Sequence, residues 1–124
     1  MHRFVLRLVT VAMIATGIFS ARPAAAAEMT WTMTSTYDYQ VSVSFYSQSR
    51  SRSWPGGDEV YVLKDSRAHP FTLSCQQGEK ICYGAWPTGG RTNKYWGVGR
   101  ANANRCNSCC YICGESNPVR ELTD

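Results

Sequence analysis

The chain has 124 residues, with 13 Lys and Arg against nine Asp and Glu, which gives a formal net charge of +4 at pH 7. Three of the basic residues, Arg3, Arg7 and Arg22, lie in the first 27 residues, so residues 28–124 carry ten basic and nine acidic side chains and a net charge of +1. A surface that binds nucleic acid needs concentrated positive charge. We therefore predict no nucleic-acid partner. The 97 residues that follow residue 27 have the length of one domain with a core of limited size.

Residues 1–27 have the pattern of a secretory signal peptide. Arg3 and Arg7 give a positive start, residues 8–19 are mostly apolar, and an alanine run ends at Ala27. A positive start, a short apolar segment and small residues before a cleavage point mark a secretory leader, whereas a membrane-spanning helix needs about 20 apolar residues. We predict cleavage after Ala27, a secreted or periplasmic location, and no stable membrane span after cleavage.

Short segments of alternating polarity predict an all-β fold. Met29, Trp31 and Met33 alternate with threonines, and residues 40–47 repeat the period of two, as in strands with one buried face. The expected strands are residues 28–35, 40–47, 59–64, 71–75, 80–86 and 94–98. We predict a small antiparallel sandwich or barrel-like domain of about six strands. The third strand is expected to be central because both of its faces are apolar.

The expected domain organisation has three parts. A signal peptide, residues 1–27, precedes a disulfide-stabilised β domain, residues 28–113, whose C-terminal loop region is rich in disulfides. Residues 114–124 form a polar C-terminal tail, which we expect to be poorly ordered.

The chain contains an even number of cysteines, which in an exported domain of this size indicates a disulfide framework. They are Cys75, Cys82, Cys106, Cys109, Cys110 and Cys113. The spacing does not fix the pairing. A bond between the adjacent Cys109 and Cys110 would strain the peptide between them. We expect at least one long-range bond from Cys75 or Cys82 to the C-terminal cysteines.

Two CxxC units lie back to back, and they allow an alternative reading as a metal site with the ligands Cys106, Cys109, Cys110 and Cys113. Four-cysteine zinc sites usually separate their CxxC units by a long loop. A redox-active CxxC usually begins a helix, whereas Gly114 and Pro118 disfavour a helix here. We therefore predict disulfides and no cofactor, and keep metal binding or thiol-redox chemistry as the alternative.

Two expected loops combine cationic and aromatic side chains, the residue types that dominate binding hot spots. The candidate contact residues are Arg50, Arg52, Trp54, Lys94, Tyr95 and Trp96. The competing interpretation makes Trp54 a cap on the core and Trp96 an ordinary strand residue. His69 is the one histidine after residue 27, and no Gly-x-Ser-x-Gly nucleophile motif accompanies it, so we predict no catalytic residues.

These features favour a small exported, disulfide-stapled β domain that acts as a non-catalytic binding or inhibitory module of the cell envelope or extracellular space. Its expected partner is an envelope glycan or an exported protein. Besides the metal-binding or thiol-redox alternative, a structural envelope protein without a defined ligand also fits the sequence.

Overall fold

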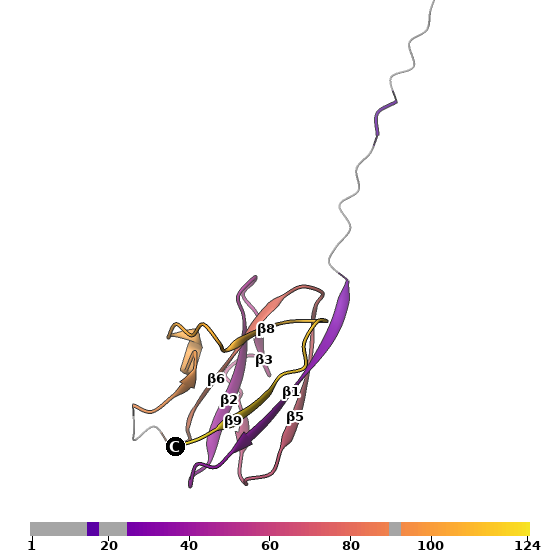
Figure 1. Ribbon diagram of the computed structural model, residues 1–124. Coiled ribbons are helices and arrows are strands. Elements are labelled where there is room, and N and C mark those ends of the chain that lie inside the picture. Colours follow the sequence, from indigo (N-terminus) through magenta and orange to yellow (C-terminus); the bar gives the residue numbers. More distant parts are fainter. Residues whose placement is uncertain (1–14, 18–24, 90–92) are drawn as a thin grey trace, which may run out of the picture.

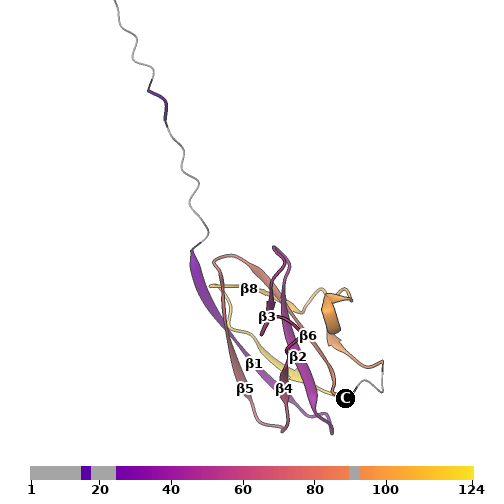
Figure 2. The ribbon, with the colours of Figure 1, turned by 180° about the vertical axis from the view of Figure 1, so that it is seen from behind.

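The computed structural model describes residues 15–17, 25–89 and 93–124, and within them two β-sheets pack face to face (Figure 1, Figure 2). The strands are β1 (Ala26–Ser35), β2 (Val41–Ser47), β3 (Ser53–Trp54), β4 (Tyr61–Leu63), β5 (His69–Gln76), β6 (Lys80–Pro87), β7 (Trp96–Gly97), β8 (Cys110–Ile112) and β9 (Val119–Leu122). A short 3-10 helix, η1 (Arg100–Asn102), lies between β7 and β8. The predicted all-β class is confirmed, and each of the six expected strands corresponds to an observed one.

The first sheet has the strand order β5-β1-β9. β1 runs antiparallel to β5 over eight residue pairs, from Ala26 opposite Gln76 to Met33 opposite His69. On its other side β1 pairs with β9 in parallel. The expectation that the tail is poorly ordered is therefore wrong for Val119–Leu122. The buried Leu122 side chain explains the difference, because it places one face of this polar segment against the core.

The second sheet is built around β2 and β6, which pair along seven residues. β3 and β4 share the outer edge of β2, while β7 and β8 share the outer edge of β6. β4 therefore lies at an edge, and the expected central position of this strand is wrong. Val60 and Val62 are more than one-third exposed, so the apolar residues on its second face are not covered.

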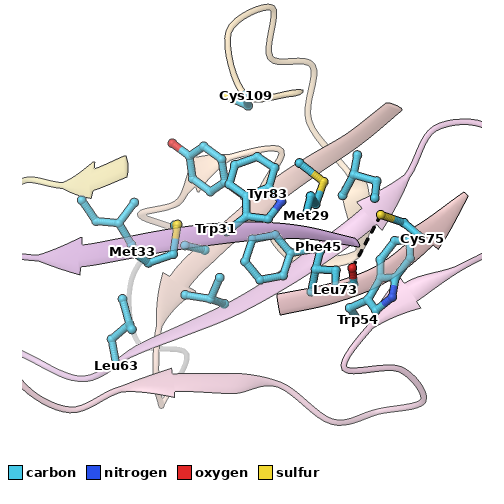
Figure 3. Packing of buried hydrophobic residues seen from close by; sticks show 14 of the residues in the cluster. Met29, Trp31, Met33, Phe45, Trp54, Leu63, Leu73, Cys75, Tyr83 and Cys109 are labelled. Carbon is cyan, nitrogen blue, oxygen red and sulfur yellow. Dashed lines mark hydrogen bonds between the residues drawn. The ribbon is translucent and has the colours of Figure 1, made fainter. Parts of the chain in front are cut away.

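The core lies between the sheets and is centred on Trp31 of β1 (Figure 3). The ring of Trp31 lies 5.1 Å from Phe45, 5.8 Å from Tyr83 and 5.4 Å from Tyr111, measured between centroids. These three partners belong to the second sheet. The period of two along β1, β2 and β6 thus supplies the residues that join the two layers.

The structure contains three disulfides, and two of them tie the C-terminal segment to the sandwich. Cys75 bonds Cys113, Cys82 bonds Cys110, and Cys106 bonds Cys109. Two of these bonds are long-range, as expected, and Cys109 and Cys110 have different partners. The sulfur atoms that a four-cysteine metal site would need as ligands are therefore bonded to one another or to the sheet.

The predicted cleavage point after Ala27 lies within β1. Ala26 and Ala27 pair with Gln76 and Cys75, and the carbonyl oxygen of Ala25 accepts a 2.8 Å hydrogen bond from the Gln77 amide. Most of the predicted signal peptide, residues 1–14 and 18–24, lies outside the described residues, so its removal stays a prediction. In the described part of the chain no helix has the length and apolar character to cross a membrane. The three disulfides are consistent with an oxidising compartment.

Candidate binding site

The outer face of the second sheet carries small and aromatic side chains in place of the usual long polar ones. In β2, Ser42, Ser44 and Tyr46 alternate with core residues, and in β6 Gly84 and Trp86 do the same. The segment from β7 through η1 passes along this outer side, away from β1 and β5 (Figure 1, Figure 2). The candidate site is formed where this segment meets the sheet.

Gly84 allows the segment to lie directly on β6. A Cβ atom at this position would overlap the carbonyl oxygen of Gly99. The amide of Val98 donates a 3.0 Å hydrogen bond to the Tyr83 carbonyl oxygen, which fixes the register of the crossing. The close contact between the two backbones therefore depends on the missing side chain at residue 84.

The η1 turn is held in an unusual backbone conformation. Ala101 and Asn102 have φ values of 58° and 55°, in the left-handed region that residues other than glycine seldom occupy. The Tyr46 hydroxyl accepts a 2.9 Å hydrogen bond from the Ala101 amide, and the Gln48 side chain donates a 3.2 Å bond to Asn102 Oδ1. A strained backbone conformation of this kind persists only where contacts with neighbouring residues hold it in place. Such conformations are found more often at functional sites than elsewhere.

The turn places Arg100 over Trp86. The guanidinium carbon lies 5.9 Å from the centroid of the ring, within the range of a cation–π contact. Arg100 is exposed and Trp86 is half-buried, so both can be reached from solvent. The pair separates two surface hollows and lines each of them.

Hollow 1 has a volume of about 300 Å³ and lies between Trp86 and the β3–β4 loop; its lining includes Ser44, Tyr46, Asp58, Glu59, Trp86 and Arg100. Hollow 2, of about 330 Å³, lies on the other side; its lining includes Trp86, Asn93, Lys94, Tyr95, Arg100 and Asn104. Hollow 3, of about 310 Å³, continues beyond Asn104; its lining includes Gln48, Lys80, Asn102, Asn104, Arg105 and Asn107. Together the three hollows form an open surface on which polar and apolar groups are mixed, with the Trp86 ring between hollows 1 and 2 and the most polar lining in hollow 3.

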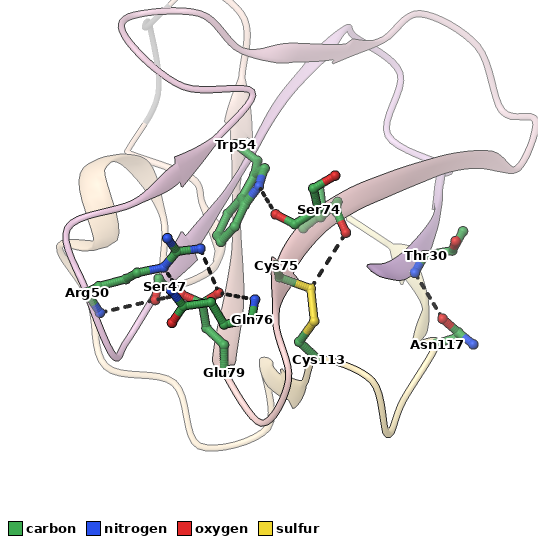
Figure 4. Close-up of a disulfide and its surroundings, with 11 residues drawn as sticks. Thr30, Ser47, Arg50, Trp54, Ser74, Cys75, Gln76, Glu79, Cys113 and Asn117 are labelled. Atoms are coloured by element: carbon green, nitrogen blue, oxygen red, sulfur yellow. Dashed lines mark hydrogen bonds and ion pairs between the residues drawn. A yellow bond between two sulfur atoms is a disulfide. The ribbon is translucent and has the colours of Figure 1, made fainter. Parts of the chain in front are cut away.

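The first candidate loop contributes mainly to the fold. Trp54 is buried, and its indole N–H donates a 3.0 Å hydrogen bond to the Ser74 carbonyl oxygen, which links β3 to β5 (Figure 4). Arg52 lies 5.4 Å over the Trp54 ring. The structure thus places Trp54 as a cap on the core, as the competing interpretation had it.

Arg50 forms an ion pair with the buried Glu79. Its Nε and Nη2 atoms lie 2.6 Å and 3.1 Å from the two carboxylate oxygens (Figure 4). Burial alone raises the pKa of Glu79, but hydrogen bonds from Arg50, from the Gln76 amide and from the Ser47 hydroxyl outweigh it and lower the pKa to about 2. Arg50 therefore has a structural partner at the β5–β6 turn.

The second candidate loop borders the site. Lys94 and Tyr95 line hollow 2, and the Tyr95 side chain is exposed. Trp96 donates its indole N–H to the Thr123 carbonyl oxygen at 2.8 Å and packs against Tyr37 with centroids 5.3 Å apart. The structure brings Lys94 and Tyr95 to the site and uses Trp96 to attach the C-terminal segment.

Sequence reasoning missed the two central residues, Trp86 and Arg100. The alternation along β6 contained a signal for Trp86: Ile81, Tyr83 and Ala85 face the core, so Trp86 falls on the opposite, outer face. A large aromatic side chain on the outer face of a strand indicates a contact or a ligand on that face. Arg100 carried no such signal, since its position depends on the conformation of η1.

Comparisons with protein-family models, with curated proteins and with solved structures found no match.

Gly84 leaves room for the backbone of Gly99 against β6. We expect Gly84→Ala to lower the free energy of unfolding by about 2–3 kcal/mol, because the added methyl group displaces the backbone of Gly99 from β6. Hydrogen exchange should show faster exchange at the Val98 amide. As a control, Gly57→Ala has open space around its Cβ and a φ of 60°, and should cost about 1 kcal/mol from backbone strain alone. Equal effects of the two substitutions would contradict the proposed contact.

Proposed function

We propose that this protein is an exported, non-catalytic binding module whose ligand contacts the outer face of the β2–β6 sheet. The observation that carries the proposal is the Arg100–Trp86 pair, which a left-handed turn holds between hollows 1 and 2. An accessible cation over an aromatic ring, on a surface that mixes polar and apolar groups, suits recognition of a polar ligand.

The chemistry of the surface favours binding over catalysis. Its side chains are aromatic rings, amides, hydroxyls and cations, together with the carboxylates of Asp58 and Glu59 in hollow 1. His69 belongs to the other sheet, where its ring nitrogen lies 2.7 Å from Asp65 Oδ1. A reactive nucleophile with a positioned base, the usual arrangement in covalent catalysis, is not formed by the described residues that line the three hollows.

Export is supported by the predicted signal peptide and by the disulfides. Because three disulfides persist only where the surroundings are oxidising, we propose that the protein acts outside the cytoplasm. The sedimentable cell envelope of the producing organism is then the first material in which to look for its ligand.

The proposal is tested by co-sedimentation of the purified, disulfide-bonded protein with that envelope fraction. We expect the unchanged protein to sediment and Trp86→Ala to remain in the supernatant. Tyr39→Ala is the matched control, since Tyr39 is 70% exposed and does not line hollows 1 to 3. Sedimentation of Trp86→Ala to the same extent as the unchanged protein would reject this face as the binding site.

A further inference from the structure

Hollows 2 and 3 join into a single band of positive charge and amides. They share Ala103 and Asn104, and we call their combined lining the amide–cation track. Its exposed cations include Lys80, Arg100 and Arg105, which form no ion pair with any described residue. None of the described residues that line hollows 2 and 3 is an aspartate or glutamate. Asp58 and Glu59 line hollow 1, and the Asp124 carboxylate lies 3.1 Å from Nζ of Lys94, the cation of hollow 2 that has an acidic partner.

The residues between these cations are suited to hydroxyl groups. Asn102, Asn104 and Asn107 line hollow 3, and Asn93 and Asn104 line hollow 2. A side-chain amide offers two donors and an acceptor, and so can bond neighbouring hydroxyls of one ligand. At the end of the track the exposed Tyr95 ring provides a surface on which the apolar face of a sugar ring can stack, while the half-buried Trp86 ring lies beneath the Arg100 guanidinium.

We propose that the amide–cation track binds an acidic glycan, a chain of sugars that carry carboxylate groups. This inference rests on the proposed binding function and names its ligand class. The guanidinium groups of Arg100 and Arg105 match a carboxylate with two parallel hydrogen bonds. Cations that stand singly among amides suit a ligand in which single charges are separated by hydroxyl-bearing rings.

Other anionic polymers fit the track less well. Nucleic-acid binding depends on the neutralisation of many closely spaced phosphates, whereas residues 28–124 have a net charge of only +1. A protein partner would be expected to bury an apolar centre, and the lining of hollow 3 is dominated by amides and cations. The sugar chain accounts for the amides, the aromatic rings and the cations together.

The test is affinity electrophoresis of the disulfide-bonded protein in gels that contain either polygalacturonate or its fully methyl-esterified form. The ionic strength is kept at about 0.15 M, because long-range attraction between charges is screened there. The two polymers share a backbone and differ in the charge of their carboxyl groups. We expect binding to polygalacturonate to be at least about tenfold tighter than binding to the ester, which corresponds to the loss of the charge-assisted hydrogen bonds.

Variants separate a specific site from general attraction to a polyanion. Arg100→Ala and Trp86→Ala should each weaken binding to polygalacturonate about tenfold, the second without any change in charge. Arg67→Ala is the control, because Arg67 is exposed and does not line hollows 1 to 3. It should change the affinity less than about twofold, as expected for a screened surface charge.

Four results would overturn the inference. Three are equal binding to both polymers, equal losses in Arg67→Ala and Arg100→Ala, and equal binding to duplex DNA at the same concentration of charge. The fourth is absence of binding to polygalacturonate. If Trp86→Ala still abolished co-sedimentation with the envelope in that case, the proposed function would stand with a different ligand.

Discussion

Replacing Cys75 and Cys113 together by alanine is expected to lower the free energy of unfolding by about 4 kcal/mol. The bond spans 38 residues and joins β5 of the first sheet to the segment that follows β8 of the second (Figure 4). While Cys82–Cys110 is intact, the loop that this bond closes consists of residues 75–82 and 110–113, and its closure contributes about 3 kcal/mol of the expected loss. Both sulfur atoms also belong to the buried core, so their removal leaves a cavity as well. Urea unfolding of the oxidised protein measures the loss.

The matched control is the removal of Cys106 and Cys109. This bond spans only three residues, so the same loop-entropy argument assigns it about 2 kcal/mol. Cys109 belongs to the buried core but Cys106 is half-buried at the edge of hollow 3, so this pair leaves a smaller cavity than Cys75 and Cys113. The double variant Cys106→Ala/Cys109→Ala should therefore unfold at a clearly higher urea concentration than Cys75→Ala/Cys113→Ala. The reverse order would show that the long-range bond is not the principal tie between the sheets.

The residues that the sequence placed correctly are those whose position depends on alternation. Met29, Trp31 and Met33 are buried as their period of two requires. The short strands β3, β8 and β9 carried no such pattern. Each is two to four residues long, and each is held by its pairing with a longer strand. Such strands depend on tertiary contacts that a local pattern cannot show.

The candidate site was predictable only in part, for the same reason. Lys94 and Tyr95 were identified from composition, and they do line hollow 2. The first loop has the same composition, yet Arg50 and Trp54 bond to Glu79 and Ser74, which lie 29 and 20 residues further along the chain. A cationic and aromatic loop thus indicates a binding surface or an anchor to the core, and only the fold distinguishes them.

Stability in acid is expected to depend on Glu79. Its pKa is about 2 in the folded protein and 4.5 as an ordinary glutamate, so the folded state binds the proton less readily than the unfolded state. The resulting stabilisation is fully present above pH 4.5 and is lost as the pH falls towards 2. The difference in pKa corresponds to about 3 kcal/mol. Between pH 5 and pH 2 the free energy of unfolding should fall by this amount in addition to the effect of the other carboxyl groups.

Glu79→Gln isolates this contribution. The variant should be less stable than the unchanged protein at pH 7, because the amide cannot replace the charged contact with Arg50. Between pH 5 and pH 2, the free energy of unfolding of the variant should fall by about 3 kcal/mol less than that of the unchanged protein. Asp58→Asn serves as the control for removal of one acidic side chain, since Asp58 is exposed and forms no ion pair with any described residue.

Arg50→Ala tests independently whether the guanidinium group of Arg50 is what lowers the pKa of Glu79. Without the guanidinium group, burial of the Glu79 carboxylate is opposed only by the Ser47 hydroxyl and the Gln76 amide, so the pKa of Glu79 should rise and the acid-induced loss should begin at a higher pH. Urea unfolding at pH 2, 3, 4, 5 and 7 gives the profile for each variant. Parallel profiles for Glu79→Gln and the unchanged protein would show that this ion pair does not govern stability in acid. In that event, the loss of stability in acid would come from other carboxyl groups of the domain.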